Sequence, residues 1–158
     1  MRTNLPEAER QDGKLPVFAS PEVAEHELFA KRDDSLRWLE GFVRRRGTEL
    51  TYEPGALDSL ERLYFELWGG GVASRVRGNR SSFESAMGVF WGAVAVAQKR
   101  ATWTIYESPF APNHFGLAVT RGGVTVVLNA FGTDWNRRPG NTRRNLLRRI
   151  YKKWFAAD

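Results

Sequence analysis

Residues 83 to 99 form the most apolar segment of the chain, and a helix built from them would be apolar on nearly every side. Such a helix must be surrounded by other elements, so the rest of the chain has to pack around it. Gly88 and Gly92 lie four residues apart and would let another backbone approach closely. The longest apolar run, residues 86 to 97, is shorter than the about 20 residues that span a bilayer. We therefore expect a buried central helix and no transmembrane segment.

The segments before this helix repeat their apolar residues with helical spacing. Ser20 is typical of a helix cap and opens a short helix toward residue 31. A second helix is predicted over residues 34 to 47 and a third over residues 56 to 68. Three consecutive glycines, residues 69 to 71, end the third helix because glycine is a poor helix former.

After residue 100 the pattern changes to alternating, β-branched sequence, which predicts strands over residues 102 to 107, 115 to 120 and 124 to 131. The short Arg-Gly-Gly turn at residues 121 to 123 joins the last two strands into an antiparallel hairpin. A final helix is predicted over residues 142 to 155. The fold class is therefore α+β, with three to four helices, a small antiparallel three-stranded sheet and a C-terminal amphipathic helix packed on it.

The domain organisation follows from length and composition. A chain of 158 residues that is 42% hydrophobic can bury one core of ordinary size. Residues 1 to 19 show no apolar periodicity, so we expect a polar N-terminal arm that is either mobile or wrapped on the surface and adds nothing to the core. A single α+β domain over residues 20 to 158 follows it. The absence of cysteine excludes a disulfide, a thiolate metal site and a cysteine nucleophile. With no signal-peptide pattern at the N-terminus, this favours the cytoplasm.

A helix carrying Gly88-x-x-x-Gly92 precedes a strand that begins Trp103-Thr-Ile-Tyr. In this respect the chain resembles uncharacterised small bacterial α+β domains over residues 34 to 131. Some of these domains act as immunity or accessory proteins, which the resemblance makes one expectation for this chain. The motif is unspecific, and the resemblance transfers no functional residue.

The net charge is concentrated at the C-terminus. Residues 137 to 158 contain eight Lys or Arg and one Asp, which leaves 16 basic and 17 acidic residues in the rest of the chain. On a helical projection, one half of the final helix is apolar and comprises Leu146, Leu147, Ile150, Tyr151, Trp154 and Phe155. The other half is basic and comprises Arg148, Arg149, Lys152 and Lys153.

This charge predicts an anion-binding segment, because a concentrated positive field attracts phosphates or carboxylates. Its candidate residues are Arg137, Arg138, Arg143, Arg144, Arg148, Arg149, Lys152 and Lys153. Trp135 precedes them and is a candidate for stacking on an unpaired base. The alternative for the basic half is a merely solvated helix face, and the alternative for Trp135 is a cover for the edge of the core.

Signals of catalysis are weak. His26 and His114 lie 88 positions apart, without metal-ligand or nucleophile spacing, so we expect no catalytic residue, metal or cofactor. Glu107 and His114 flank one loop and could form an acid and base pair, although such residues are usually only solvated. The glycine-rich loop that carries Arg75, Arg77 and Arg80 lacks the Gly-Lys-Ser/Thr ending of a P-loop.

The sequence thus favours a non-enzymatic binding domain that contacts an anionic partner through its basic C-terminal helix. Nucleic acid is slightly favoured over an acidic protein, because each neutralised phosphate releases counterions. The alternatives are an immunity or accessory protein that acts by protein-protein contact, a peripheral membrane binder and, least favoured, an enzyme. The oligomeric state and the choice between DNA and RNA stay open.

Overall fold

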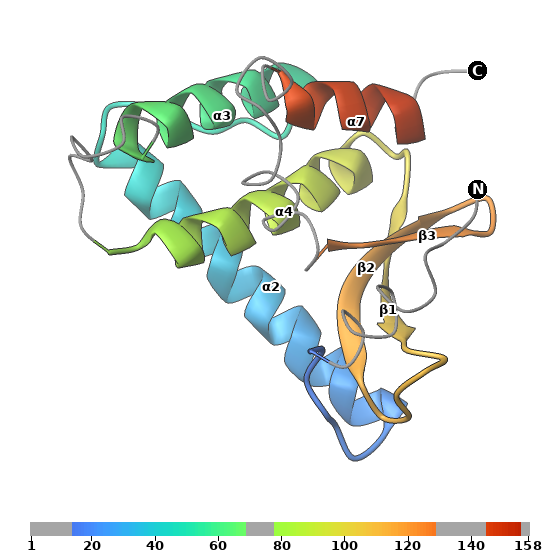
Figure 1. Cartoon of the computed structure of the whole chain (residues 1–158). Coiled ribbons are helices and arrows are strands. Elements are labelled where there is room, and N and C mark those ends of the chain that lie inside the picture. The colour runs from blue at the N-terminus through green and yellow to red at the C-terminus, as the bar shows by residue number, and fades with distance from the viewer. Residues whose placement is uncertain (1–13, 69–77, 129–144, 156–158) are drawn as a thin grey trace.

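The computed structural model describes residues 14–68, 78–128 and 145–155 of the chain (Figure 1). These residues form four helices and one three-stranded sheet, which confirms the α+β class. The helices are α2 (Pro21–Arg44), α3 (Pro54–Trp68), α4 (Arg80–Ala97) and α7 (Leu146–Phe155). The strands are β1 (Thr102–Glu107), β2 (Phe115–Arg121) and β3 (Val124–Val127). Among the described helices, none is both long and apolar enough to cross a membrane.

The sheet has the order β1-β2-β3 and is antiparallel throughout, as the sequence predicted. Thr102 at the start of β1 lies opposite Thr120 near the end of β2. The hairpin between β2 and β3 turns at Gly122 and Gly123, whose φ angles are +55° and +81°. Residues other than glycine rarely adopt these backbone angles, so the two glycines allow the tight turn.

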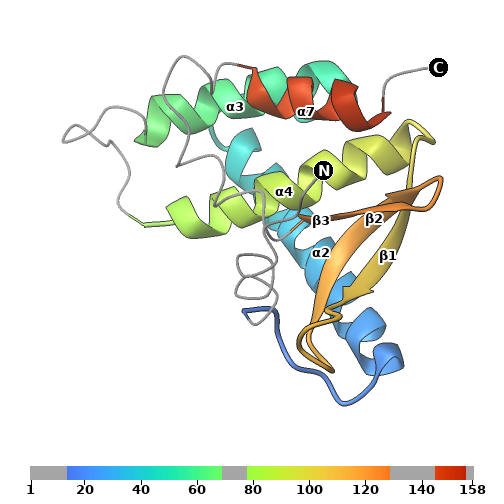
Figure 2. The same cartoon turned by 45° about the vertical axis from the view of Figure 1, so that its right-hand side comes forward.

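Helix α4 is the centre of the molecule, which confirms its predicted burial. Ten of its residues are buried. It lies between the helices α3 and α7 on one side and the sheet on the other (Figures 1 and 2). The close approach at Gly92 is made by side chains rather than by another backbone, since a Cβ there would lie 2.7 Å from Leu128 and 3.2 Å from Val119. Glycine at this position lets the helix lie directly on the sheet.

The first two predicted helices are one continuous helix, α2. Ser20 caps it as predicted, with its Oγ accepting a hydrogen bond from the backbone N–H of Val23 at 3.2 Å. The charged segment that suggested a break, residues 31 to 35, contains neither glycine nor proline. Charged residues cost a helix little, and buried Leu28 and Leu39 anchor it on both sides of this segment.

The C-terminal helix packs on other helices, which corrects the prediction that it lies on the sheet. Helix α7 contacts α3 and α4. Its apolar side chains join the main core together with Trp91 of α4. Helix α4 lies between α7 and the strands β1 and β2 (Figure 2). The sequence shows that one half of this helix must be buried, but α3, α4 and the sheet all offer apolar surfaces that could bury it.

The segment 14–19, which was expected to lie outside the core, packs along the end of the sheet. Val17 forms an isolated β-bridge with His114, and the backbone N–H of Phe115 donates to the carbonyl of Pro16 at 3.0 Å. Leu15 and Phe18 are buried, and Phe18 joins a small second core with residues of α2 and β2. One short extended segment has no periodicity, so the sequence pattern did not reveal this contact.

Candidate anion-binding site

Helix α7 presents two different faces, as its sequence predicted. Four side chains of the apolar half are buried, namely Leu146, Leu147, Tyr151 and Phe155. Ile150 and Trp154 pack against the same core and are half-buried. The side chains of Arg149, Lys152 and Lys153 are exposed, and we call these three residues the basic face. Most of the apolar half is docked, so the surface of this helix that is available for recognition is mainly polar.

Trp91 of α4 contacts α7 along most of its length. Its indole is fully buried, and Nε1 donates a hydrogen bond to the carbonyl oxygen of Leu147 at 3.0 Å. Its ring lies 5.0 Å from that of Phe155 and 6.3 Å from that of Tyr151, measured between centroids. These contacts combine buried apolar area with one directed bond, so they fix both the position and the rotation of α7.

Glu61 of α3 holds the first turn of α7. Its buried carboxylate accepts hydrogen bonds from the backbone N–H groups of Leu146 and Leu147, both at 3.3 Å. The first N–H groups of a helix have no partner within the helix, and the N-terminus favours negative charge. Burial raises the pKa of Glu61, nearby Asp58 adds to this effect, and the hydrogen bonds from the α7 backbone oppose it.

Replacing Glu61 with glutamine is expected to change how stability depends on pH. The pKa of Glu61 in the folded protein lies above its usual value of 4.5, so the folded state binds this proton more tightly than the unfolded state does. The stability that this proton contributes is fully present below pH 4.5 and is lost as pH rises through the folded pKa. As pH rises through this range, the free energy of unfolding of the wild type should therefore decrease relative to that of Glu61→Gln.

Urea unfolding of both proteins at several pH values measures this difference. Glu66→Gln, on the exposed side of the same helix, is the matched control and should change stability by less than about 0.5 kcal/mol. Parallel pH profiles for the wild type and Glu61→Gln would contradict the prediction.

Arg148 of α7 forms an ion pair within the protein. Its Nη1 lies 2.7 Å from Oδ2 of Asp58 on α3, and both side chains are partly buried. This ion pair offsets one of the four charges that the sequence assigned to an exposed stripe. The exposed stripe is therefore reduced to the basic face.

A cavity of about 290 Å³ opens beside the basic face, between the start of α3, the end of α4 and α7. It is lined by Pro54, Gln98, Arg100, Arg148, Tyr151, Lys152 and Phe155, and we call it the basic pocket. Arg100 was not singled out from the sequence, because two adjacent cations, Lys99 and Arg100, between a helix and a strand belong to no motif. Only the packing of α7 on α4 brings it next to Arg148 and Lys152.

Several predicted residues lie outside the described part of the chain. These are Trp135, Arg137, Arg138, Arg143 and Arg144, together with the glycine-rich loop residues Arg75 and Arg77. Their predicted roles stay predictions.

The loop that carries Glu107 and His114 is held by backbone contacts. The Nδ1 of His114 lies 2.6 Å from the carbonyl oxygen of Leu15, and Oε2 of Glu107 accepts a hydrogen bond from the N–H of Asn113 at 3.4 Å. Each side chain is thus used to tie the loop to its surroundings. Because Glu107 and His114 bind these backbone groups and not each other, the geometry gives no support to an acid and base pair.

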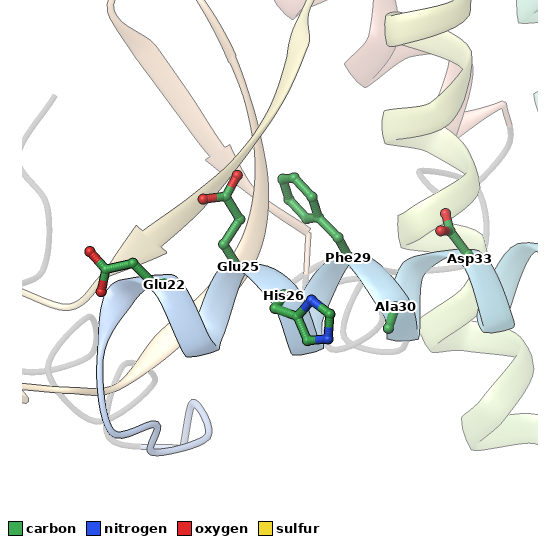
Figure 3. Close-up of a pocket in the computed structure, with 6 residues that line it drawn as sticks. All are labelled: Glu22, Glu25, His26, Phe29, Ala30 and Asp33. Carbon is green, nitrogen blue, oxygen red and sulfur yellow. The ribbon is translucent and has the colours of Figure 1, made fainter.

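His26 lies on an acidic groove of about 500 Å³ along one side of α2 (Figure 3). The groove is lined by Glu22, Glu25, His26, Phe29, Ala30 and Asp33. Within residues 14–68, 78–128 and 145–155, no group of three or more His, Asp or Glu side chains is arranged to hold a metal ion.

Comparison with known proteins identifies one relationship. A family model described as "Uncharacterised protein YwmA" matches residues 17–155. No curated protein and no solved structure matches the chain significantly. The family match agrees with the resemblance to uncharacterised small bacterial domains, and its description names no activity or partner.

Proposed function

The chain belongs to the uncharacterised YwmA family, and we propose that it is a non-enzymatic domain that binds nucleic acid through the basic face of α7. The observation that carries this proposal is the docking of α7. Its apolar half is buried, whereas Arg149, Lys152 and Lys153 are exposed on a helix that Trp91 and Glu61 hold in place. A rigid row of cations binds a polyanion without having to order itself first.

Docking of α7 also weighs against the peripheral membrane alternative. An interfacial helix enters the lipid headgroup region with its apolar face. The corresponding residues of α7, including Leu147, Tyr151 and Phe155, are buried against α3 and α4. The basic face could attract anionic lipid by charge, but the apolar face of α7 is packed in the core and is not free to enter the lipid.

A polyanion suits the basic face better than an acidic protein does. Protein interfaces obtain most of their affinity from large apolar or aromatic side chains that are buried at their centre. Beside the three exposed cations, α7 offers only the half-buried rings and chains of Ile150 and Trp154. Phosphate backbones need no such anchor, because counterion release provides the binding free energy.

The proposal predicts weakly sequence-dependent binding with a strong salt dependence. If three phosphates are neutralised, log affinity should fall against log salt concentration with a slope of about −2 to −3. Replacing Arg149 and Lys153 with glutamine should weaken binding to all sequences alike and reduce the slope by roughly two phosphate equivalents. Stability should change by less than about 0.5 kcal/mol for each exposed substitution.

Fluorescence anisotropy with single-stranded and double-stranded ligands at several salt concentrations measures these slopes. The matched control is Lys31→Gln with Arg44→Gln, which removes two exposed cations of α2 and the same net charge. The control should retain the wild-type slope. Absence of binding at low salt, or an equal loss in both double variants, would contradict the proposal and favour an acidic protein partner.

A further inference from the structure

The basic pocket differs from the basic face because its cations come from separate elements and line one concavity. Arg100 follows α4, whereas Arg148 and Lys152 lie one turn apart on α7. At about 290 Å³ the pocket lies at the lower limit of the about 300–1,000 Å³ that is typical of small-ligand sites. It is too small for a duplex and suits a single charged group with the atoms next to it.

The pocket carries an excess of positive charge. In the described part of the chain, Arg100 and Lys152 form no ion pair, and Arg148 shares its charge with Asp58. This pair is also incompletely bonded, because Nε of Arg148 and Oδ1 of Asp58 are buried without a hydrogen-bond partner. Buried polar atoms are normally hydrogen-bonded, so this ion pair leaves one donor and one acceptor unsatisfied beside the pocket.

Tyr151 gives the pocket both an aromatic wall and a hydroxyl group. Burial raises the pKa of this hydroxyl, whereas the charges of Arg100 and Arg121 lower it. Both guanidinium groups therefore lie within electrostatic range of the tyrosine oxygen. A neutral tyrosine hydroxyl can donate a hydrogen bond to an anionic oxygen.

We propose that the basic pocket binds a phosphomonoester, specifically the terminal phosphate of a nucleic-acid strand whose backbone lies on the basic face. This inference rests on the proposed function and adds that the protein prefers a strand with a phosphorylated end. A terminal phosphate carries close to two negative charges at neutral pH, which match the two cations without an acidic partner. An internal phosphate carries one charge and is flanked by chain on both sides, so it fits the exposed face rather than a concavity of this size.

The test compares short single strands of one sequence that end in a 5′-phosphate, a 3′-phosphate or only hydroxyl groups. One of the phosphorylated strands should bind the wild type about tenfold or more tightly than the hydroxyl strand, since charge-assisted hydrogen bonds are strong. Arg100→Gln should remove this preference and leave binding of the hydroxyl strand nearly unchanged. Lys99→Gln, the neighbouring exposed cation that does not line the pocket, should retain the preference.

The outcomes separate the pocket from the basic face. Equal affinity for all three strands, with salt-dependent binding intact, would overturn the pocket inference and leave the proposed function standing. No binding of any strand at low salt would overturn the proposed function. Chemical shifts titrated with a nucleoside monophosphate and with inorganic phosphate complete the test. Binding of these probes without any preference for a phosphorylated strand would show that the ligand is a free phosphate or a small phosphate ester, and would overturn the assignment to a strand end.

Discussion

Gly92→Leu is expected to prevent folding, because the new side chain would occupy space that the sheet already fills. A Cβ alone at Gly92 would lie 2.7 Å from Cδ1 of Leu128 and 3.2 Å from Cγ1 of Val119. The leucine would add three more carbon atoms in the same direction, and overpacking a core costs roughly 1–3 kcal/mol or more. Val119 is fully buried in the central strand, so it has little room to move. We expect insoluble protein, or a soluble chain whose circular dichroism shows no cooperative unfolding.

Alanine variants make this prediction quantitative. Gly92→Ala should destabilise the protein, although less than leucine does, because the end of the Leu128 side chain can shift. Gly41→Ala is the matched control in helix α2, where a Cβ would meet nothing closer than 3.9 Å. Alanine is a better helix former than glycine by about 1 kcal/mol, so Gly41→Ala should leave stability unchanged or raise it. Equal stability of the two alanine variants would contradict close packing of α4 on the sheet.

Trp91→Ala is expected to lower stability by about 3–5 kcal/mol, the usual cost of removing a fully buried tryptophan. This corresponds to a fall in Tm of roughly 6–20 °C for a chain of this length. The substitution removes the ring contacts to Tyr151 and Phe155 and the hydrogen bond to the Leu147 carbonyl. Because these contacts hold α7, folded Trp91→Ala should also bind nucleic acid more weakly, although no cation is lost.

Trp91→Phe separates the two contributions of this residue. Phenylalanine keeps most of the apolar contact with Phe155 but cannot donate to Leu147. The carbonyl of Leu147 lies inside α7, so this loss should cost about 0.5–1.5 kcal/mol. Thermal unfolding followed by circular dichroism, and anisotropy at one salt concentration, measure both effects. A Trp91→Ala variant with wild-type stability would contradict the anchoring of α7 by α4.

These variants also distinguish a surface that binds from a surface that is merely charged. Arg149 and Lys153 contribute charge without supporting the core, whereas Trp91 supports the core without contributing charge. If the basic face recognises phosphate in a defined geometry, both kinds of substitution should weaken binding, but only the loss of charge should reduce the salt slope. Nonspecific attraction to the net charge would respond to charge alone.

Much of the fold followed from local features of the sequence. The change from helical spacing to alternation near residue 100 predicted the α+β class, and Gly122 and Gly123 predicted the hairpin. The burial of α4 and the two faces of α7 also followed from the spacing of apolar residues. Each of these features depends on residues a few positions apart, for which propensity, capping and periodicity are sufficient signals.

The tertiary structure alone decided which of these surfaces meet. Arg148 pairs with Asp58 across 90 positions, and Trp91 bonds to Leu147 across 56 positions. These contacts place α7 on α3 and α4, remove Arg148 from the exposed stripe and bring Arg100 to the pocket. An amphipathic pattern shows that a face is buried, but several apolar surfaces of similar character can bury it. The choice among them depends on how side chains far apart in sequence fit together, and no local pattern in the sequence encodes that fit.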